Sequence, residues 1–356
     1  MAPKFNLEQY DYMNDSCLKI AVLGGGSFGT VIANMCAEKG HDVRQWMRNQ
    51  SAAEEINRVH RNTRYLPGYK LEANLVAYSD IERALKDVDV LFVSIPSANF
   101  RSVLKQAADY LCNDVQVIST TKGVESNTFN MMSQIIAQEL PQARVGVLSG
   151  PNFAKELALK HLTATVIASH DQALRETVQK LLHQAYFRIY ASDDIDGVEL
   201  GGVLKNIYAI ASGLSSALGM GENTHSMLLT RALAEMSRFA VSMGANPMTF
   251  LGLAGVGDLV ATCNSPLSRN YRVGHALGLG KTLEEAVAEL GQVAEGVNTV
   301  ALVRNKSIEL NVYMPLLQGL YAVVYEGAAP SKVAKSLMLS EQGADVEFVL
   351  PGQAVC

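Results

Sequence analysis

The sequence predicts an α/β domain with a doubly wound, largely parallel sheet, followed by an all-α domain. The first observation is length: 356 residues, 48% of them hydrophobic, are enough for two domains with sizeable cores. The second is that residues 17–192 alternate short apolar runs with helical segments, which is typical of βαβ units. The third is that residues 193–340 carry long helical patterns and almost no strand signal.

The elements expected in the first half follow from these patterns in chain order. Apolar, β-rich runs predict strands at 18–23, 42–47, 88–94, 115–120, 145–148, 164–168 and 187–190. Helical segments between them are expected at 27–39, 81–86, 100–110, 131–140 and 172–183. In the second half, helices are expected at 196–218, 224–243, 283–290, 298–310 and 316–325. We expect residues 1–16 to form a loose N-terminal extension and 341–356 a loose C-terminal tail.

Composition excludes several classes of protein. The formal net charge of −5 argues against nucleic-acid binding, which needs a basic face. No apolar run approaches the ~20 residues that span a bilayer, and the first 16 residues lack the blocks of a signal peptide. The five cysteines are scattered and show no CxxC spacing, so we expect neither disulfides nor zinc, and a cytoplasmic location. The sequence also has no HExxH motif and no cluster of histidine ligands, so we expect no metal.

A glycine loop follows the first expected strand directly and opens the first expected helix. In Gly24-x-Gly26-x-x-Gly29, the first glycine permits a tight turn and the second lets the backbone approach a pyrophosphate. Gly29 lets the helix pack close to the strand, and the helix N-terminus attracts phosphate. This context favours a Rossmann dinucleotide-binding domain over a plain glycine-rich turn.

The tip of the second strand bears on the choice of cofactor. NAD enzymes commonly place an acid here, about 20 residues beyond the glycines, to bind the ribose hydroxyls. This tip reads Trp46-Met47-Arg48-Asn49, and Asp42 lies at the other end of the strand. The Arg48 guanidinium suits a 2′-phosphate, although a solvated surface arginine is the alternative. We therefore expect NADPH/NADP as cofactor, and NADH/NAD as well, with the preference open.

Polar residues inside the apolar second half are candidates for chemistry. Lys205 lies within the apolar stretch 201–208, where burial would lower its pKa and suit it to acid/base work. A snorkelling lysine on an amphipathic face is the alternative. Asp258 follows the glycine run 252–257, and Ser268-Arg269-Asn270 precedes a helix, where it suits a phosphate or serves as a plain N-cap.

Three loops of the first domain are expected at one edge of the sheet. Thr120-Thr121-Lys122-Gly123, the segment 149–154 and Ile95-Pro96-Ser97 each follow a strand. In open α/β sheets, ligands bind at the carboxyl ends of the strands. The sequence therefore predicts a site at this edge.

At this point the motifs resemble a known family. GGGSFG, ISTTKG, LSGPNFAKE, LGGVLKNIYAI, GLAGVGDLVATC, SRNYRVG and QVAEG are similar, in order and spacing, to those of the bacterial-type NAD(P)-dependent glycerol-3-phosphate dehydrogenases, over about residues 18–339. The resemblance implies reduction of dihydroxyacetone phosphate to sn-glycerol 3-phosphate, the precursor of glycerophospholipids. It also implies a Rossmann domain, a helical substrate domain and a homodimer.

The resemblance also implies roles for individual residues. Those implied to contact the cofactor, besides the glycines of the loop, are Ser27, Phe28, Arg48, Tyr65, Lys122, Ala154, Arg269, Val293 and Glu295. Those implied to bind substrate are Lys122, Gly150, Asn152, Lys205, Asp258, Ser268, Arg269 and Asn270. Lys205 is implied to be the catalytic acid/base, with Lys122 adding positive charge and Asp258 orienting Lys205. Asn152 departs from many relatives, which have Ser or Thr there.

Two other functions stay open at this stage. The first is a related two-domain reductase of the 6-phosphogluconate or ketopantoate type, against which the SRN and GLAGVGDL blocks argue. The second is an inactive nucleotide-sensing module. That second hypothesis predicts the loss of a key polar residue, yet Lys122, Lys205, Asp258 and Arg269 are all present.

Overall fold

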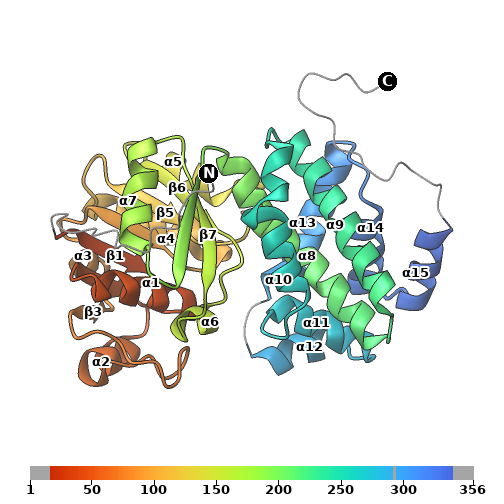
Figure 1. Ribbon diagram of the computed structural model, residues 1–356, viewed down its shortest axis with the longest axis horizontal. Coiled ribbons are helices and arrows are strands. Elements are labelled where there is room, and N and C mark those ends of the chain that lie inside the picture. The colour runs from red at the N-terminus through yellow and green to blue at the C-terminus, as the bar shows by residue number, and fades with distance from the viewer. Residues whose placement is uncertain (1–16, 292–293, 340–356) are drawn as a thin grey trace, which may run out of the picture.

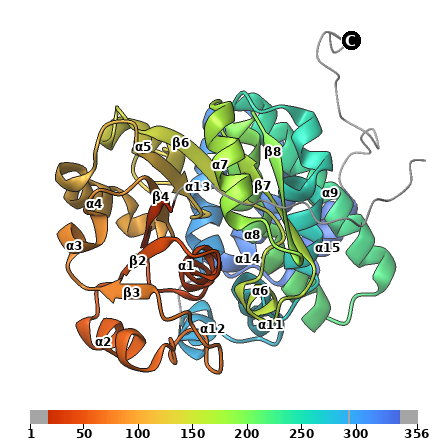
Figure 2. The same ribbon diagram turned by 60° about the vertical axis from the view of Figure 1, so that its left-hand side comes forward.

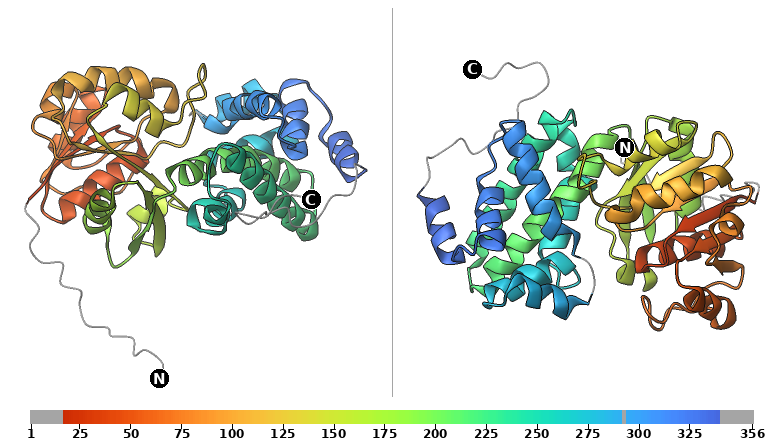
Figure 3. Two further views of the ribbon diagram at one scale, coloured as in Figure 1. Left: turned by 90° about the horizontal axis from the view of Figure 1, so that it is seen from above. Right: turned by 180° about the vertical axis from the view of Figure 1, so that it is seen from behind.

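The computed structural model describes residues 17–291 and 294–339, and the fold class agrees with the prediction. A mixed sheet with helices on both faces forms the first half, and helices alone form the described part of the second (Figure 1). Figure 3 shows the same two parts from above and from behind. The expected extension 1–16, the tail 341–356 and Val293 lie outside the described residues. The expected domain bounds at residues 17, 192 and 340 stay a prediction.

One eight-stranded sheet organises the first half. Its order is β3 (Leu75–Tyr78), β2 (Asp42–Trp46), β1 (Lys19–Leu23), β4 (Val90–Val93), β5 (Gln116–Ser119), β6 (Arg144–Ser149), β7 (Thr163–Ala168) and β8 (Phe187–Ser192). Every neighbouring pair is parallel except β6 and β7, which are antiparallel. Strands β1 to β6 therefore end at the same edge, as the three expected ligand loops require.

Side chains of one strand point alternately into two different cores. Ile20 and Val22 pack under α1 (Ser27–Glu38), α2 (Gln50–Val59), α6 (Ala154–Ala158) and α7 (Gln172–Leu182). Ala21 and Leu23 pack on the opposite face under α3 (Ile81–Leu85), α4 (Ser97–Ala107) and α5 (Met132–Glu139). Figure 2 shows the two sets of helices on either side of the strands. Because successive side chains face opposite sides of the sheet and helices cover both sides, these strands read as continuous apolar runs.

Several short elements were not predicted from the sequence. Strand β3 and helix α2 were not expected, because Leu75–Tyr78 is only four residues long and α2 is mostly polar. Helix α2 begins at an N-cap, Asn49, whose side chain accepts a hydrogen bond from the Ala52 amide. Helix α6 and the last described helix, α15 (Pro330–Met338), were also missed. Short elements with little buried surface give a weak periodic signal.

Helix α8 is the centre of the helical half. It spans Ile195–Ala217 and is buried almost all round, which explains its weak amphipathic pattern. The other helices of this half are α9 (Glu222–Ser242), α10 (Asp258–Cys263), α11 (Arg269–Gly278), α12 (Leu283–Leu290), α13 (Glu295–Glu309) and α14 (Pro315–Tyr325), with α15 at the end. Two short turns lie between α9 and α10, the 3₁₀ turn η2 (Pro247–Leu251) and the π-helical turn η3 (Leu253–Gly257).

Helices α8 and α11 approach each other so closely that glycine is needed at the crossing. A Cβ on Gly274 of α11 would lie 1.8 Å from the carbonyl oxygen of Ile210, and one on Gly213 of α8 would lie 2.0 Å from that of Tyr271. Any larger side chain would therefore collide with rigid backbone. This crossing fixes the start of α11 relative to the helix that carries Lys205.

Two buried glutamates supply acceptors to the first amides of other helices. Glu199 of α8 accepts hydrogen bonds from the amide and hydroxyl of Ser133 at the start of α5. Glu235 of α9 accepts from the amides of Leu316 and Leu317 at the start of α14. Burial raises the pKa of each carboxyl to about 7, while these hydrogen bonds act in the opposite direction. Glu199 thereby ties the helical half to the sheet half.

Replacing Gly274 with alanine tests the α8–α11 crossing. Because the new methyl group meets backbone atoms that cannot move independently, we expect the free energy of unfolding to fall by about 3 kcal/mol or more. Urea denaturation measures it. Gly221→Ala is the control, because a Cβ there meets nothing within 4 Å. Equal stability of the two variants would contradict this account of the crossing.

Candidate functional site

The glycine loop is held by close backbone contacts at the carboxyl edge of the sheet. Gly24 has a φ of +130°, and a Cβ there would lie 2.2 Å from the carbonyl oxygen of Ser94. A Cβ on Gly29 would lie 2.6 Å from the carbonyl oxygen of Gly24. Both positions therefore require glycine for the turn itself and for packing the helix against the strand, as the motif predicts.

Gly26 differs because the space that a side chain would occupy there is open. A Cβ there would meet no atom within 4 Å, and Gly26 is the N-cap of α1, with no side chain capping the helix. The first amides of α1 therefore have no capping side chain as partner, and they carry the positive end of the helix dipole. This cradle fits the pyrophosphate of a dinucleotide, which takes the place that a capping side chain would occupy.

Two buried amide side chains hold the loop from behind. Gln45 of β2 donates to the Gly24 carbonyl at 2.9 Å, and Asn62 donates to the Gly25 carbonyl at 2.9 Å. Both also donate to the Thr30 hydroxyl at 2.9 Å. Neither residue was predicted from the sequence. A buried glutamine within an apolar strand was the available signal for Gln45, whereas Asn62 lies in a polar stretch that gave none.

The other predicted cofactor residues near the loop come from three segments. Ser27 donates from its hydroxyl to the Tyr65 carbonyl at 2.9 Å, which brings these two predicted residues together. The guanidinium of Arg64 lies 5.3 Å from the centre of the Tyr65 ring. Arg48 is exposed in the turn between β2 and α2, and Trp46 at the end of β2 pairs with Leu23 beside the loop. A phosphate on the ribose would therefore find Arg48 accessible.

Lys205 and Asp258 form a buried ion pair inside the helical half. The Lys205 ammonium donates to Oδ1 of Asp258 and, at 2.8 Å, to the hydroxyl of Thr262. Lys205 is 5% exposed and Asp258 is 1% exposed, so Lys205 is no snorkelling surface lysine. Thr262 was missed, although it stands four residues after Asp258 on the same helical face.

Lys122 reaches the same carboxylate from the sheet half. Its ammonium donates to Oδ2 of Asp258 at 2.8 Å, to the Gly150 carbonyl at 3.0 Å and to Oδ1 of Asn152 at 3.2 Å. The Asn152 amide donates in turn to Thr165 at 3.1 Å. The two lysines therefore meet across one carboxylate. They stand 83 positions apart, counted as 205 − 122, and belong to different halves of the chain.

The electrostatics of this group suit proton transfer. Burial lowers the pKa of Lys205 to about 7; the charge of Asp258 opposes this shift and that of Lys122 adds to it. Two ammonium groups share one carboxylate, so the site carries an excess of positive charge within an acidic chain. Such a site can donate a proton near neutral pH and stabilise a negative charge that develops beside it.

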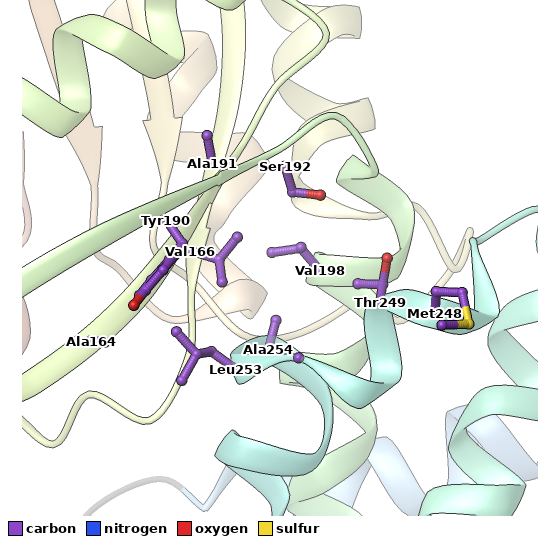
Figure 4. Close-up of a pocket in the computed structure, with 11 residues that line it drawn as sticks. Ala164, Val166, Tyr190, Ala191, Ser192, Val198, Met248, Thr249, Leu253 and Ala254 are labelled. Atoms are coloured by element: carbon purple, nitrogen blue, oxygen red, sulfur yellow. The ribbon is translucent and has the colours of Figure 1, made fainter. Parts of the chain in front are cut away.

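The backbone that presents Asp258 is tightly packed. The π-helical turn η3 leads directly into α10, and a Cβ on Gly201 of α8 would lie 2.4 Å from the carbonyl oxygen of Ala254. Irregular turns of this type occur frequently at functional sites. Behind η3 lies a pocket of about 390 Å³, around which Figure 4 shows Val166, Val198 and Leu253. None of its lining residues is charged, so it is separate from the ion pair.

Of the three residues Ser268, Arg269 and Asn270 at the start of α11, two make hydrogen bonds within the protein. Ser268 is the N-cap, and its oxygen accepts from the Tyr271 amide at 3.2 Å. Asn270 accepts from the Gly296 amide at 3.0 Å, and Arg269 is exposed. Ser268 therefore does serve as an N-cap, but because its oxygen acts as an acceptor there, its hydroxyl proton can still be donated to a ligand. The predicted substrate role of all three stays a prediction.

Glu295 joins the site from the start of α13. Its carboxylate accepts from the Ser97 amide at 3.2 Å, at the first turn of α4. Burial raises its pKa, while the hydrogen bonds of Ser97 and the charges of Arg269 and Lys122 act in the opposite direction. Glu295 therefore lies close enough to both Arg269 and Lys122 to be affected by their charges. The remaining predicted cofactor residues, Phe28 and Ala154, pack beside the first core, and Val293 lies outside the described residues.

Comparisons with known proteins agree with this geometry. Residues 19–175 match the family model of the NAD-dependent glycerol-3-phosphate dehydrogenase N-terminus, and residues 194–335 match that of its C-terminus. The chain is 58% identical over 340 residues to the glycerol-3-phosphate dehydrogenase (NAD(P)+) of Acinetobacter baumannii, covering 96% of this chain and 95% of that protein. It is 57% identical over 330 residues to that of Pseudomonas entomophila, covering 93% and 96%.

A solved structure is similar along most of its length. The crystal structure of glycerol-3-phosphate dehydrogenase from Coxiella burnetii superposes with a TM-score of 0.87 at 35% identity. The match covers 91% of this chain and 99% of that one. The similarity therefore extends over both the sheet and the helices, and hence over both sources of the lysine pair.

Replacing Gly26 with valine tests the cradle. Since a Cβ at this position meets no atom within 4 Å, we expect only the small loss of thermal stability that valine causes at an N-cap. The dissociation constant for NADPH should rise about tenfold or more, because the side chain would occupy the space of the pyrophosphate. Isothermal titration calorimetry measures the constant. Wild-type affinity would place the phosphates elsewhere.

Proposed function

The chain belongs to the NAD-dependent glycerol-3-phosphate dehydrogenase family, and from this premise we propose that it interconverts dihydroxyacetone phosphate and sn-glycerol 3-phosphate, with Lys205 as the acid/base. The observation that carries the proposal is the buried contact of Lys205 and Lys122 with the single carboxylate of Asp258. The cofactors are NADPH/NADP and NADH/NAD, in keeping with the NAD(P)+ of the relatives' name. Arg48, in place of an acid, supports acceptance of the phosphorylated form.

The chemistry assigns each residue of the ion-pair group a task. The nicotinamide, when bound, supplies the hydride that reduces the carbonyl carbon of dihydroxyacetone phosphate. Lys205 donates a proton to the carbonyl oxygen as negative charge develops there. Lys122 adds positive potential, which stabilises that oxygen. Asp258 holds both ammonium groups, and Thr262 fixes the direction of the Lys205 ammonium through its hydroxyl.

Binding of the phosphate is a separate task, assigned to the start of α11. Ser268, Arg269 and Asn270 stand at a helix N-terminus, where amides and the helix dipole favour an anion. Gly150 and Asn152, already in contact with Lys122, line the substrate site on the sheet side. Anchoring the phosphate away from the reacting carbon uses binding energy to orient the carbonyl.

The two alternatives are weaker. The 6-phosphogluconate and ketopantoate reductases are other families, and this chain matches the glycerol-3-phosphate models in both halves. An inactive sensing module would have no use for a buried lysine with a lowered pKa.

We further propose that the protein is a cytoplasmic homodimer that supplies glycerophospholipid synthesis. No described helix is long and apolar enough to cross a membrane, and the described residues contain no cluster suited to a metal.

Replacing Lys205 with methionine tests the acid/base role. The variant lacks the proton donor, so we expect turnover with dihydroxyacetone phosphate and NADPH to fall by about 10² or more, with NADPH affinity nearly unchanged. Steady-state absorbance at 340 nm measures turnover, and its dependence on NADPH concentration reports on the affinity for NADPH. Lys306→Ala, which removes an exposed ion pair with Glu309, is the matched lysine control. Turnover near wild type would refute the assignment.

The kcat/KM of the wild-type enzyme should change with pH in opposite directions for the reductive and the oxidative reaction. In the reducing direction Lys205 must be protonated, so kcat/KM falls as pH rises through the lowered pKa near 7. In the oxidising direction the neutral amine is needed, so kcat/KM rises over the same interval.

Replacing Arg269 with alanine tests the phosphate site. The loss of a charge-assisted hydrogen bond should lower kcat/KM for dihydroxyacetone phosphate by about 10- to 100-fold, yet leave the slow reaction with unphosphorylated dihydroxyacetone nearly unchanged. Arg272→Ala, also exposed on α11, is the matched control. Equal losses with both substrates would mean that Arg269 does not bind the phosphate.

A further inference from the structure

The segment 122–131, called the strap here, lies between β5 and α5 and inserts into the helical half. Val124 and Met131 form an isolated antiparallel bridge and are both buried in the core of the helical half. The ring of Phe129 packs edge-on against Phe239 of α9, with 6.0 Å between the ring centres. The strap begins at Lys122, which reaches Asp258, so its path determines where that ammonium lies.

On its other side, the strap is fixed to α4 at two points. A Cβ on Gly123 would lie 2.6 Å from the Cβ of Ser97, so the backbone next to Lys122 rests directly on the first turn of α4. One turn further along, Arg101 binds Glu125 with two hydrogen bonds, Nε to Oε1 at 2.6 Å and Nη2 to Oε2 at 2.8 Å. Residues four apart on one helix thus contact residues two apart on the strap, which sets both its position and its direction.

Glu125 also organises the strap internally. Its carboxylate accepts from Thr128 and from the side-chain amide of Asn130, and its own amide donates to the Asn130 carbonyl at 2.9 Å. Arg101 contacts Glu139 of α5 as well. The hydrogen bonds of Arg101 lower the pKa of Glu125 to about 2, so the carboxylate is ionised throughout the working range of the enzyme.

From this arrangement we propose that Arg101 and Glu125 are positioning residues for Lys122, holding the strap so that the Lys122 ammonium stays against Asp258. The inference rests on the function proposed above for Lys122. Neither residue contacts the lysines or Asp258; both act through the backbone of the strap. A displacement of about 1 Å in a reacting group can reduce turnover by about 10²-fold, so the effect of the clamp should be measurable.

If Arg101 and Glu125 only stabilised the fold, their replacement would not move the pH profile of the enzyme. Lys205 is faced by Asp258, Thr262 and Cys263 from α10 and by Lys122 from the strap. The charge of Lys122 lowers the pKa of Lys205, so moving Lys122 away raises that pKa. A displaced strap should therefore move the alkaline limb of the reductive pH profile to higher pH, which a general loss of stability would not do.

The experiment compares Arg101→Ala and Glu125→Gln in the full-length enzyme with Arg144→Ala. Arg144 forms an ion pair with Asp171 whose exposure is similar to that of the Arg101–Glu125 pair, and it lies at the end of β6 opposite the ligand loops. Arg144→Ala therefore removes a comparable ion pair without touching the strap. We expect both strap variants to lower kcat about 10- to 100-fold and to raise the pH of the alkaline limb. Arg101→Lys should recover part of kcat, because it keeps the charge but not the two-point contact. Arg144→Ala should keep wild-type kcat and limb.

A double-mutant cycle with Lys122→Met separates this inference from the proposed function. If Arg101 acts through Lys122, then Arg101→Ala should lower kcat little further in the Lys122→Met background. A full additional loss there, or strap variants with wild-type kcat and limb, would overturn the positioning role. Wild-type kcat in Lys122→Met alone would instead overturn the proposed role of Lys122. Glu125→Gln, which preserves shape and one acceptor, serves if Arg101→Ala fails to fold.

Discussion

The contact of two ammonium groups with the carboxylate of Asp258 is the constraint on which the rest of the structure depends. A charge buried to this degree is costly, and removing one partner of such a pair commonly costs about 3–5 kcal/mol. The carboxylate of Asp258 is stable here because Lys205 approaches one oxygen and Lys122 the other. Since the two lysines come from different halves of the chain, the contact also determines how the sheet and the helices must meet.

The backbone around that contact is built for close approach. Gly201 lets α8 touch the turn that presents Asp258, and Gly213 and Gly274 let α8 and α11 cross with almost no space between them. By contrast, the open surroundings of Gly26 leave room for a ligand at the start of α1. Rigid packing therefore lies where protons move, and space lies where the proposed pyrophosphate binds.

Charge is distributed unevenly in this acidic chain. Away from the site, the buried carboxylates Glu199 and Glu235 serve as acceptors for the first amides of other helices, where the helix dipole favours negative charge. Within the site, Lys122 and Lys205 exceed the single acid between them, and Arg269 stands exposed nearby. A local excess of positive charge is enough to attract a small phosphorylated substrate, whatever the net charge of the protein.

The sequence by itself determined the fold class and the glycine loop and marked the central residues as candidates, because these depend on local signals, whereas the roles of those residues came from the family resemblance. Continuous apolar runs, glycines between a strand and a helix, and a lysine in an apolar stretch can be recognised without knowledge of distant contacts. What the sequence could not determine is which distant groups meet. That Lys122 shares Asp258 with Lys205, that Gln45 and Asn62 support the glycine loop, and that Arg101 clamps the strap are decided by tertiary packing. Each joins positions separated by tens of residues, and the distance between them exists only once the chain has folded.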